Sequence, residues 1–285
     1  MCLTGDPRKT PIIVPVHAKG WRRRNAIAQL YDRIGSGYDV TRRPDPIIAG
    51  RLGHHLALET DGNYLDIACG TGNYTFTLAA VGGSRTGIEL SAKMIAEARG
   101  KSSQVQWCLA RAQELPFSGG VFSGAMCTLA IHHFDDLLPV FREAHRVMDE
   151  GKFVILTATP EQMQSYWLNE YFPEAMLKSI EQMPALELVT GALTQSGFTS
   201  LETERFDIRN DLQDFFLYSG KHRPEMYLDE GVRRGISTFA SLADPAEVAG
   251  GCLRLAADIQ SGRINEVMAA YENRGGDYLF VIATK

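Results

Sequence analysis

The feature that most constrains the fold is a repeated alternation between short apolar runs and longer stretches of helical periodicity. Segments with the pattern of strands stand at residues 63–68, 84–90, 105–109, 121–130 and 152–158. Between these runs, apolar residues recur every three or four positions, as they do on one face of a helix. Because a helix between two strands favours a parallel crossover, this order predicts a doubly wound α/β sheet covered on both faces.

The C-terminal part of the chain departs from this alternation. Residues 184–195 have the pattern of a helix, residues 198–206 that of a sixth strand, and residues 277–284 that of a last strand. The intervening residues 207–276 show helical periodicity, and an unstructured loop of that length is rare in a compact domain. We therefore expect a helical insertion between the sixth and seventh strands.

These patterns divide the chain into four parts. We expect an extended N-terminal arm, a pair of N-terminal helices, a core that includes the last strand, and the insertion. Their bounds are residues 1–24, residues 25–60, residues 61–206 with 277–285, and residues 207–276.

Composition narrows the class of protein. Apolar residues make up 45% and charged residues 22%, as in soluble globular domains, and no run approaches the ~18 apolar residues of a membrane span. The net charge of −5 argues against nucleic acid or acidic lipid as a partner. Five scattered cysteines without a C-x-x-C pair argue against a disulfide framework, so we expect a cytoplasmic protein, monomeric or homodimeric.

The strongest local motif is LDIACGTG at residues 65–72. A strand that contains Asp66 runs into a turn of small residues, which opens a helix and lets a ligand approach backbone amides. A second carboxylate, Glu89, closes the next strand, where it can accept both hydroxyls of a ribose. Gly70 and Gly72 alone could merely shape a turn. Together with the two carboxylates, they indicate a site for a nucleoside-containing cofactor.

The motif favours one such cofactor over dinucleotides. The dinucleotide fingerprint places a third glycine where this chain has Thr75. Asp66 stands before the turn, where it would repel a pyrophosphate and attract an ammonium group. S-adenosylmethionine is therefore favoured over NAD.

At this point the sequence resembles the class I S-adenosylmethionine-dependent methyltransferases, in the branch of ubiquinone/menaquinone biosynthesis. Residues 65–72 resemble the first motif of that family. The similarity continues in order through residues 87–91, 112–117, 129–134 and 146–148. It implies a Rossmann-like sheet of seven strands with the last strand antiparallel. It also implies S-adenosylmethionine as cofactor and S-adenosylhomocysteine as product.

The resemblance also implies roles for individual residues. Asp66 and the Ala68 carbonyl would face the methionyl ammonium, Glu89 would hold the ribose, and Tyr31 and Tyr38 would close a lid formed by residues 25–60. The full set of implied cofactor-binding residues is Tyr31, Tyr38, Asp66, Ala68, Gly70, Glu89, Leu90, Met94, Arg111, Ala112, Gln113 and Leu129.

Two of these positions depart from the family pattern. Ala68 replaces the commoner glycine, and Arg111 stands where the family often has an aspartate that accepts from the adenine amino group. Arginine cannot accept a hydrogen bond, so that contact would fall to Gln113 or to the backbone.

Candidates for catalysis follow the fourth strand. His132 or His133 would act as a general base near the transferred methyl, or both would only shape the pocket. Asp135 and Asp136 are better explained as helix caps than as ligands, so no metal is expected.

Aromatic residues after the fifth strand and in the insertion have the composition of a small-molecule pocket or of ordinary core. The candidate substrate-binding residues are Tyr166, Tyr171, Phe216, Tyr218 and His222. Because the insertion leaves the sheet at the cofactor edge, we expect it to form a lid that carries acceptor specificity.

The expected function is therefore in-line methyl transfer to an oxygen, nitrogen or carbon nucleophile of a small-molecule acceptor. Such a reaction depends mainly on proximity and alignment. Two alternatives stay open: a protein that binds S-adenosylmethionine without transferase activity, and an NAD-dependent oxidoreductase.

Overall fold

The computed structural model of the chain describes residues 37–271 and 275–285. The expected N-terminal arm and the first part of the expected lid, including Tyr31, lie outside the described residues.

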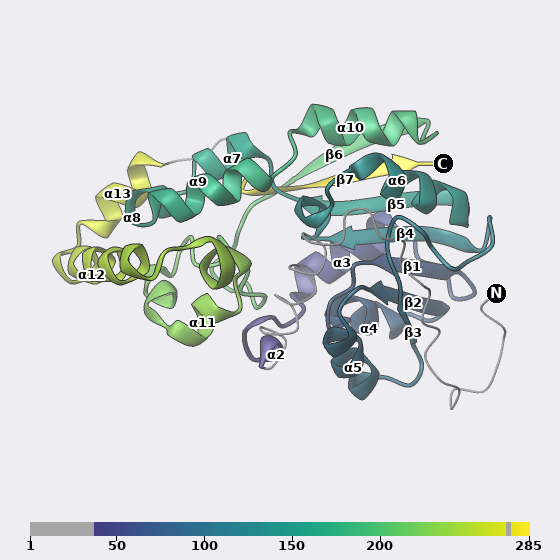
Figure 1. The fold of residues 1–285 in the computed structure, drawn as a ribbon, viewed down its shortest axis with the longest axis horizontal. Coiled ribbons are helices and arrows are strands. Elements are labelled where there is room, and N and C mark those ends of the chain that lie inside the picture. Colours follow the sequence, from purple (N-terminus) through teal and green to yellow (C-terminus); the bar gives the residue numbers. More distant parts are fainter. Residues whose placement is uncertain (1–36, 272–274) are drawn as a thin grey trace.

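The centre of the molecule is a seven-stranded sheet with the order β3-β2-β1-β4-β5-β7-β6 (Figure 1). Its strands are β1 Asn63–Ile67, β2 Ser84–Glu89, β3 Gln106–Leu109, β4 Phe122–Thr128, β5 Met148–Thr157, β6 Ser200–Phe206 and β7 Tyr278–Thr284. The first five strands are parallel, and β7 runs antiparallel to both of its neighbours, β5 and β6. The Rossmann-like doubly wound sheet with an antiparallel last strand, predicted from the sequence, is confirmed.

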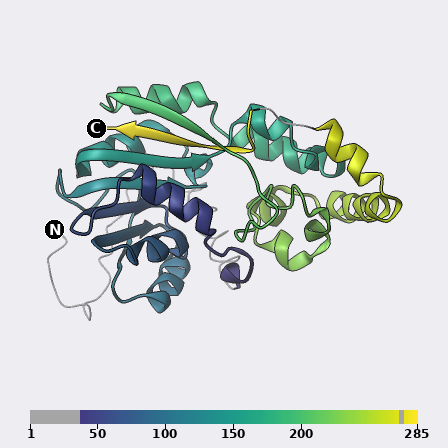
Figure 2. The same ribbon diagram turned by 180° about the vertical axis from the view of Figure 1, so that it is seen from behind.

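Helices cover both faces of this sheet, which explains why β1 and β7 are buried along almost their whole length, whereas the edge strand β6 is mostly exposed. One face is covered by α3 Pro46–His55 and α4 Asn73–Ala79, with α5 Ala92–Lys101 beside them. Figure 2 shows α3 in front of the sheet in the view from behind. The other face is covered by α6 Leu137–Val147 and α10 Leu186–Gln195. The carboxyl ends of the parallel strands are left uncovered by these helices.

A second, wholly helical lobe lies at that end of the sheet (Figures 1 and 2). Two stretches of chain build it. The first contains α7 Pro160–Gln164, α8 Leu168–Tyr171 and α9 Pro173–Gln182. The second contains η2 Pro224–Leu228, α11 Glu230–Arg234, the π-helical turn η3 Thr238–Leu242, α12 Pro245–Ser261 and α13 Ile264–Ala270. We call residues 160–182 together with residues 207–271 the cap.

The cap is larger than the insertion that the sequence predicts. Residues 160–182 were expected in the core, whereas α9 packs on η3, and α12 packs on α8. The rings of Phe172 and Phe239 meet edge to face at 5.0 Å. The physical reason is that the apolar face of these helices finds its partner about 70 residues further along the chain, and helical periodicity does not say which partner buries a face.

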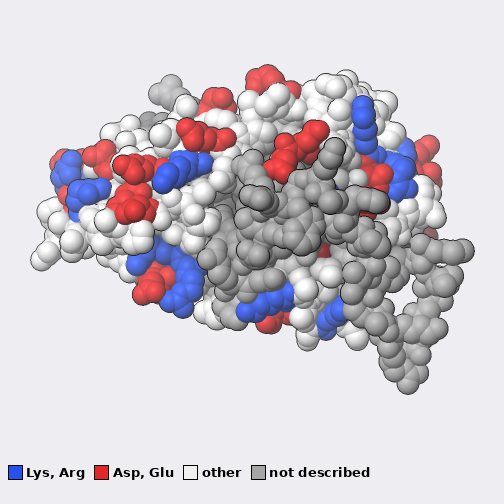
Figure 3. Space-filling model, in the orientation of Figure 1, with Lys and Arg blue, Asp and Glu red and all other residues white. Residues whose placement is uncertain are grey.

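Charged residues of both signs are interspersed on the described surface in Figure 3. Among residues 37–271 and 275–285, no helix is both long enough and apolar enough to cross a membrane.

Candidate functional site

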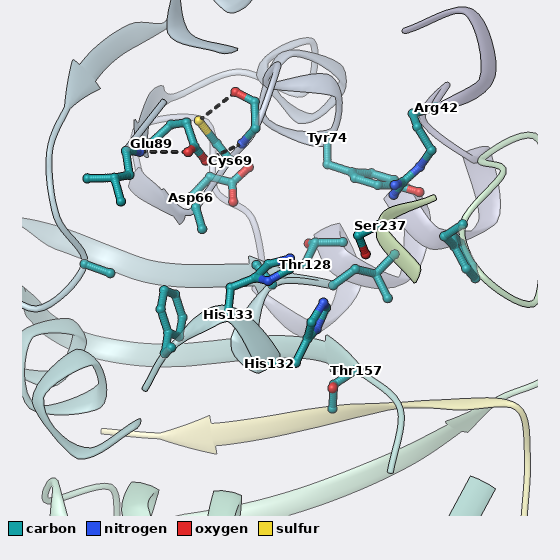
Figure 4. A pocket seen from close by; sticks show the side chains of 18 of the residues that line it. Arg42, Asp66, Cys69, Tyr74, Glu89, Thr128, His132, His133, Thr157 and Ser237 are labelled. Carbon is teal, nitrogen blue, oxygen red and sulfur yellow. Dashed lines mark hydrogen bonds between the residues drawn. The ribbon is translucent and has the colours of Figure 1, made fainter. Parts of the chain in front are cut away.

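A cavity of about 420 Å³ lies between the carboxyl ends of the parallel strands and the cap. This volume is within the ~300–1,000 Å³ typical of small-molecule sites. Turns after β1, β2, β3 and β4 line it on the sheet side, and α9, η3 and the residues around Phe216 line it on the cap side. Figure 4 shows the side chains that point into it.

The turn after β1 is built by residues with left-handed backbone. Gly70 has φ +57°, and a Cβ there would meet open space, so the backbone faces the cavity directly. Gly72 has φ +73°, and a Cβ there would lie 2.1 Å from the Trp107 ring, so only glycine fits. Ala68 and Leu129, which follow β1 and β4, have φ of 59° and 54° although neither is a glycine. Such strain tends to gather at functional sites.

Asp66 projects from β1 beneath this turn, with 3% of its surface exposed. Its Oδ2 accepts a hydrogen bond from Thr75 Oγ1 at 2.6 Å, whereas its buried Oδ1 has no partner within residues 37–271 and 275–285. Burial raises the pKa of Asp66 to about 7, the Thr75 hydrogen bond opposes this shift, and the charge of Glu89 adds to it. A buried carboxylate oxygen without a partner is suited to a cationic ligand group. The methionyl ammonium of S-adenosylmethionine meets that requirement, so the residues fit the cofactor that the sequence predicts.

Glu89 lies across the same turn, at the end of β2. Its Oε2 accepts from the Gly70 amide at 3.1 Å, and its Oε1 accepts from the amides of Leu90 and Ser91 at 2.8 and 2.9 Å. Three backbone donors therefore fix the orientation of the carboxylate at the cavity wall. Figure 4 shows Glu89 and Asp66 together at one end of the cavity, away from Arg42.

Most of the other predicted cofactor residues lie on the cavity wall. These are Tyr38, Ala68, Gly70, Leu90, Arg111, Ala112, Gln113 and Leu129. Met94 does not line the cavity: it is fully buried and packs against Tyr38. The reason is that Ser91 caps α5, accepting from the Met94 amide at 3.2 Å, and this start of the helix turns Met94 inward.

The two candidate catalytic histidines lie in the short helix η1 Ile131–His133, which follows β4. Burial and the positive charge of Arg42 lower the pKa of His132 to about 4, and burial and His132 lower the pKa of His133 well below its usual value. Both imidazoles are therefore uncharged near neutral pH. In the part of the chain that the structure describes, the buried atoms His132 Nδ1 and Thr128 Oγ1 have no hydrogen-bond partner. Figure 4 shows the histidines between the Asp66 end and the side where Ser237 and Thr157 lie.

The cap side of the cavity combines apolar side chains with hydroxyls. Its apolar lining consists of Met163, Met183, Phe216, Leu217 and Ile236, and its hydroxyls belong to Ser179, Ser237 and Thr238. The hydroxyls of Ser179 and Thr238 are hydrogen-bonded to each other at 2.9 Å, which joins α9 to η3.

An ion pair that the sequence does not predict lies at the cap side of the cavity. Arg42 Nε lies 2.5 Å from Asp214 Oδ1, and Tyr74 donates to Asp214 Oδ2 at 3.1 Å. Both charged residues line the cavity. Because they are 172 positions apart in the sequence, no local pattern pairs them.

Of the five predicted substrate-binding residues, only Phe216 lines the cavity. Tyr166 and Tyr218 stack on each other at 3.8 Å, Tyr171 donates to Asp258 Oδ2 at 2.8 Å, and His222 Nε2 lies 3.0 Å from the Ile208 carbonyl oxygen. These four residues therefore make structural contacts outside the cavity lining, which corrects their prediction as substrate-binding residues. The tyrosines are buried because aromatic rings at helical spacing fill the interior of the cap and its junction with the sheet.

Among residues 37–271 and 275–285, no three histidine, cysteine or acidic side chains are grouped so as to hold a metal ion.

Comparisons with known proteins agree with this geometry. A family model described as a methyltransferase domain matches residues 65–156. The chain is 26% identical over 212 residues to a demethylmenaquinone methyltransferase of Chlorobaculum parvum, covering 64% of this chain and 88% of the relative. It is 27% identical over 177 residues to an O-methyltransferase of Aspergillus sclerotiorum, covering 57% of this chain and 63% of the relative.

A solved structure extends the similarity to the cap. It is a putative methyltransferase from an antibiotic biosynthesis pathway of Anabaena variabilis, with 33% identity and a TM-score of 0.78. The match covers 86% of this chain and 99% of that one. The motif order, the strand order and these matches agree, and the chain belongs to the class I S-adenosylmethionine-dependent methyltransferases, where it resembles the ubiquinone/menaquinone-biosynthesis branch.

Proposed function

We propose that the cavity holds S-adenosylmethionine at its Asp66–Glu89 end and a small, uncharged, largely apolar acceptor under the cap. One observation carries this proposal: a single cavity connects the two carboxylates to His132 and to the apolar lining of the cap. When bound, the cofactor supplies a methyl group on a positively charged sulfur, which is already a good leaving group. The protein then has to bind, align and exclude water.

At the cofactor end, the residues are assigned by their burial and by their hydrogen bonds. Asp66 Oδ1 meets the ammonium group, because it is buried and has no partner among the described residues. Glu89 holds the ribose, since its carboxylate is fixed at the cavity wall by three amides. Leu90, Ala112 and Gln113 enclose the adenine. Arg111 lines the same end but offers only donors.

At the acceptor end, the charges favour a neutral molecule. Arg42 and Asp214 neutralise each other at 2.5 Å, and most of the remaining cap lining is apolar. The relatives named above include a demethylmenaquinone methyltransferase and an O-methyltransferase. Quinone-type and hydroxyl-bearing molecules are therefore the first acceptors to test.

His132 is the residue best suited to orient the acceptor's nucleophile. Its Nδ1 is buried and has no partner in the described part of the chain, and an uncharged imidazole can accept a hydrogen bond from a hydroxyl. With a pKa of about 4 it is a weak base. Alignment therefore supplies most of the rate, and proton transfer to His132 is a secondary contribution.

The test is a methyl-transfer screen. The protein is incubated with S-adenosylmethionine carrying a deuterated methyl group and with metabolite extracts, and labelled products are identified by mass spectrometry. We expect labelled products that are neutral and oxygen-bearing. Cofactor binding without any labelled product across a broad panel would favour a binding protein. Stabilisation by NADH but not by S-adenosylhomocysteine would favour an oxidoreductase.

A further inference from the structure

A short segment of the chain touches both halves of the cavity. Residues 38–45, which we call the strap, contain the four-residue helix α2 Tyr38–Thr41 and end at Asp45, the N-cap of α3. On one side the strap contacts the cofactor turn and the helices that follow it, and on the other it contacts the cap.

On the cofactor side, the strap is held through Asp39. Its Oδ1 accepts from Thr71 Oγ1 at 2.6 Å and from Asn73 Nδ2 at 3.0 Å, and its Oδ2 lies 2.6 Å from Lys101 Nζ. The Asn73 side chain also donates to the Arg42 carbonyl. Thr71 and Asn73 belong to the turn that opens α4, so the strap and the cofactor turn are joined directly.

On the cap side, the strap holds three consecutive residues of the insertion. Arg42 is paired with Asp214, and the side chains of this pair are only 15% and 3% exposed. The backbone amides on either side of Asp214 also donate to the strap. Gln213 donates to Asp45 Oδ2 at 3.0 Å, and Phe215 donates to the Thr41 carbonyl at 2.9 Å.

We propose that the strap couples the two halves of the cavity, with Asp39 and Arg42 as positioning residues. A molecule bound against the turn at residues 68–73 fixes Asp39, which fixes the strap and thereby closes the cap over the acceptor. Coupling of this kind is reciprocal: whatever factor the closed cap adds to cofactor affinity, the bound cofactor adds to closure. The inference rests on the proposed placement of the cofactor at this turn.

The amides of Gln213 and Phe215 give a direct readout, because they donate to the strap only while it is in place. Hydrogen exchange is followed in peptides spanning residues 208–218, with and without saturating S-adenosylhomocysteine. In the wild-type protein we expect the ligand to slow this exchange by about tenfold, within the usual range of coupling between sites. In Asp39→Asn, which does not line the cavity, the ligand should still bind at saturation but lose most of this slowing.

The reverse direction is tested at the cap. Asp214→Asn should weaken S-adenosylhomocysteine by about tenfold in calorimetry, and the Asp39→Asn/Asp214→Asn double variant should lose less than the two losses multiplied together. Asp211→Asn is the matched control. Asp211 lies three residues before Asp214 and forms an exposed ion pair with Arg209, so this substitution should leave both readouts unchanged. If Asp214→Asn does not fold, the exchange measurement on Asp39→Asn still decides.

The outcomes separate this inference from the proposed function. If S-adenosylhomocysteine binds the wild-type protein but does not slow exchange at residues 208–218, coupling by the strap is wrong. Equal slowing in the wild-type protein and in Asp39→Asn also overturns it. If S-adenosylhomocysteine does not bind at all, the proposed cofactor site fails, and with it the premise of the coupling.

Discussion

The two halves of the cavity are built in different ways. The cofactor half comes mainly from one stretch, residues 66–113, whose contributing residues stand at the carboxyl ends of β1, β2 and β3 or soon after them. The acceptor half is assembled from four separate stretches, residues 38–42, 128–135, 157–183 and 214–238, together with Tyr278 of β7. The first is therefore fixed by local sequence and by the sheet, and the second by long-range packing. We expect substitutions in the first half to act on cofactor affinity, and substitutions in the second to act on the acceptor.

The largest effect should come from the acceptor half. If His132 takes a proton from the acceptor, His132→Ala should lower turnover by ~10²–10⁴-fold and leave affinity for S-adenosylhomocysteine nearly unchanged. Steady-state kinetics measures turnover, and calorimetry measures affinity for S-adenosylhomocysteine. His133→Ala is the variant for comparison. Losses below about tenfold in both variants would mean that alignment alone drives transfer.

The next largest effect should come from the cofactor half of the cavity. Glu89→Ala should weaken S-adenosylhomocysteine at least about tenfold, because charged hydrogen bonds are worth ~1.5–3 kcal/mol each. The substitution also removes the hydrogen bond that the Gly70 amide donates to Glu89. Glu97→Ala, an exposed carboxylate on α5, is the control and should bind normally. Unchanged affinity in Glu89→Ala would remove the assignment of the ribose site.

Substitution of Asp66 should have opposite effects on the stability of the fold and on affinity for S-adenosylhomocysteine. Its pKa is about 7 in the folded protein against an ordinary 3.8. As pH rises from about 4 to 7, the unfolded chain loses this proton first, so the folded state becomes progressively less stable. At ~1.4 kcal/mol per pKa unit, the three-unit shift corresponds to roughly 4 kcal/mol at most by pH 8.

Asp66→Asn removes that penalty. Its melting temperature should exceed that of the wild-type protein at pH 8, with the difference shrinking toward pH 5. Its affinity for S-adenosylhomocysteine should fall, since the partner of the ammonium is gone. A variant that is less stable than the wild-type protein at pH 8 would contradict the burial of an ionised Asp66.

The smallest effect concerns backbone strain in the cofactor turn. A left-handed conformation costs a non-glycine residue roughly 1 kcal/mol, so Ala68→Gly should stabilise the fold by up to about that amount in chemical denaturation. Ala57→Gly is the matched control, because Ala57 has φ 50° but does not line the cavity. Stabilisation by Ala57→Gly together with destabilisation by Ala68→Gly would show that the Ala68 methyl group contributes packing that outweighs its strain.

The part of the structure that can be predicted from the sequence follows the same division between the two halves of the cavity. The strands and the turn at residues 65–72 carry periodicity and spacing that are read directly, and the fold they predict is confirmed. The Arg42–Asp214 pair carries no such signal, because its partners meet only once the cap is assembled. The same holds for residues 166–172: their aromatic spacing predicts a buried face, but spacing does not distinguish a core from a pocket. Tyr166 and Tyr171, which the sequence predicts to bind substrate, are buried outside the cavity lining.

The cap's discontinuity has a consequence for how acceptor preference can change during evolution or engineering. Because α8 and α9 pack on η3 and α12, a cap taken from a relative cannot be transplanted as one contiguous segment. Exchanging residues 207–276 alone would leave Phe172 and the buried face of α9 packed against a different partner. We therefore expect point substitutions in the cavity lining to change acceptor specificity more easily than exchange of a whole segment of the cap.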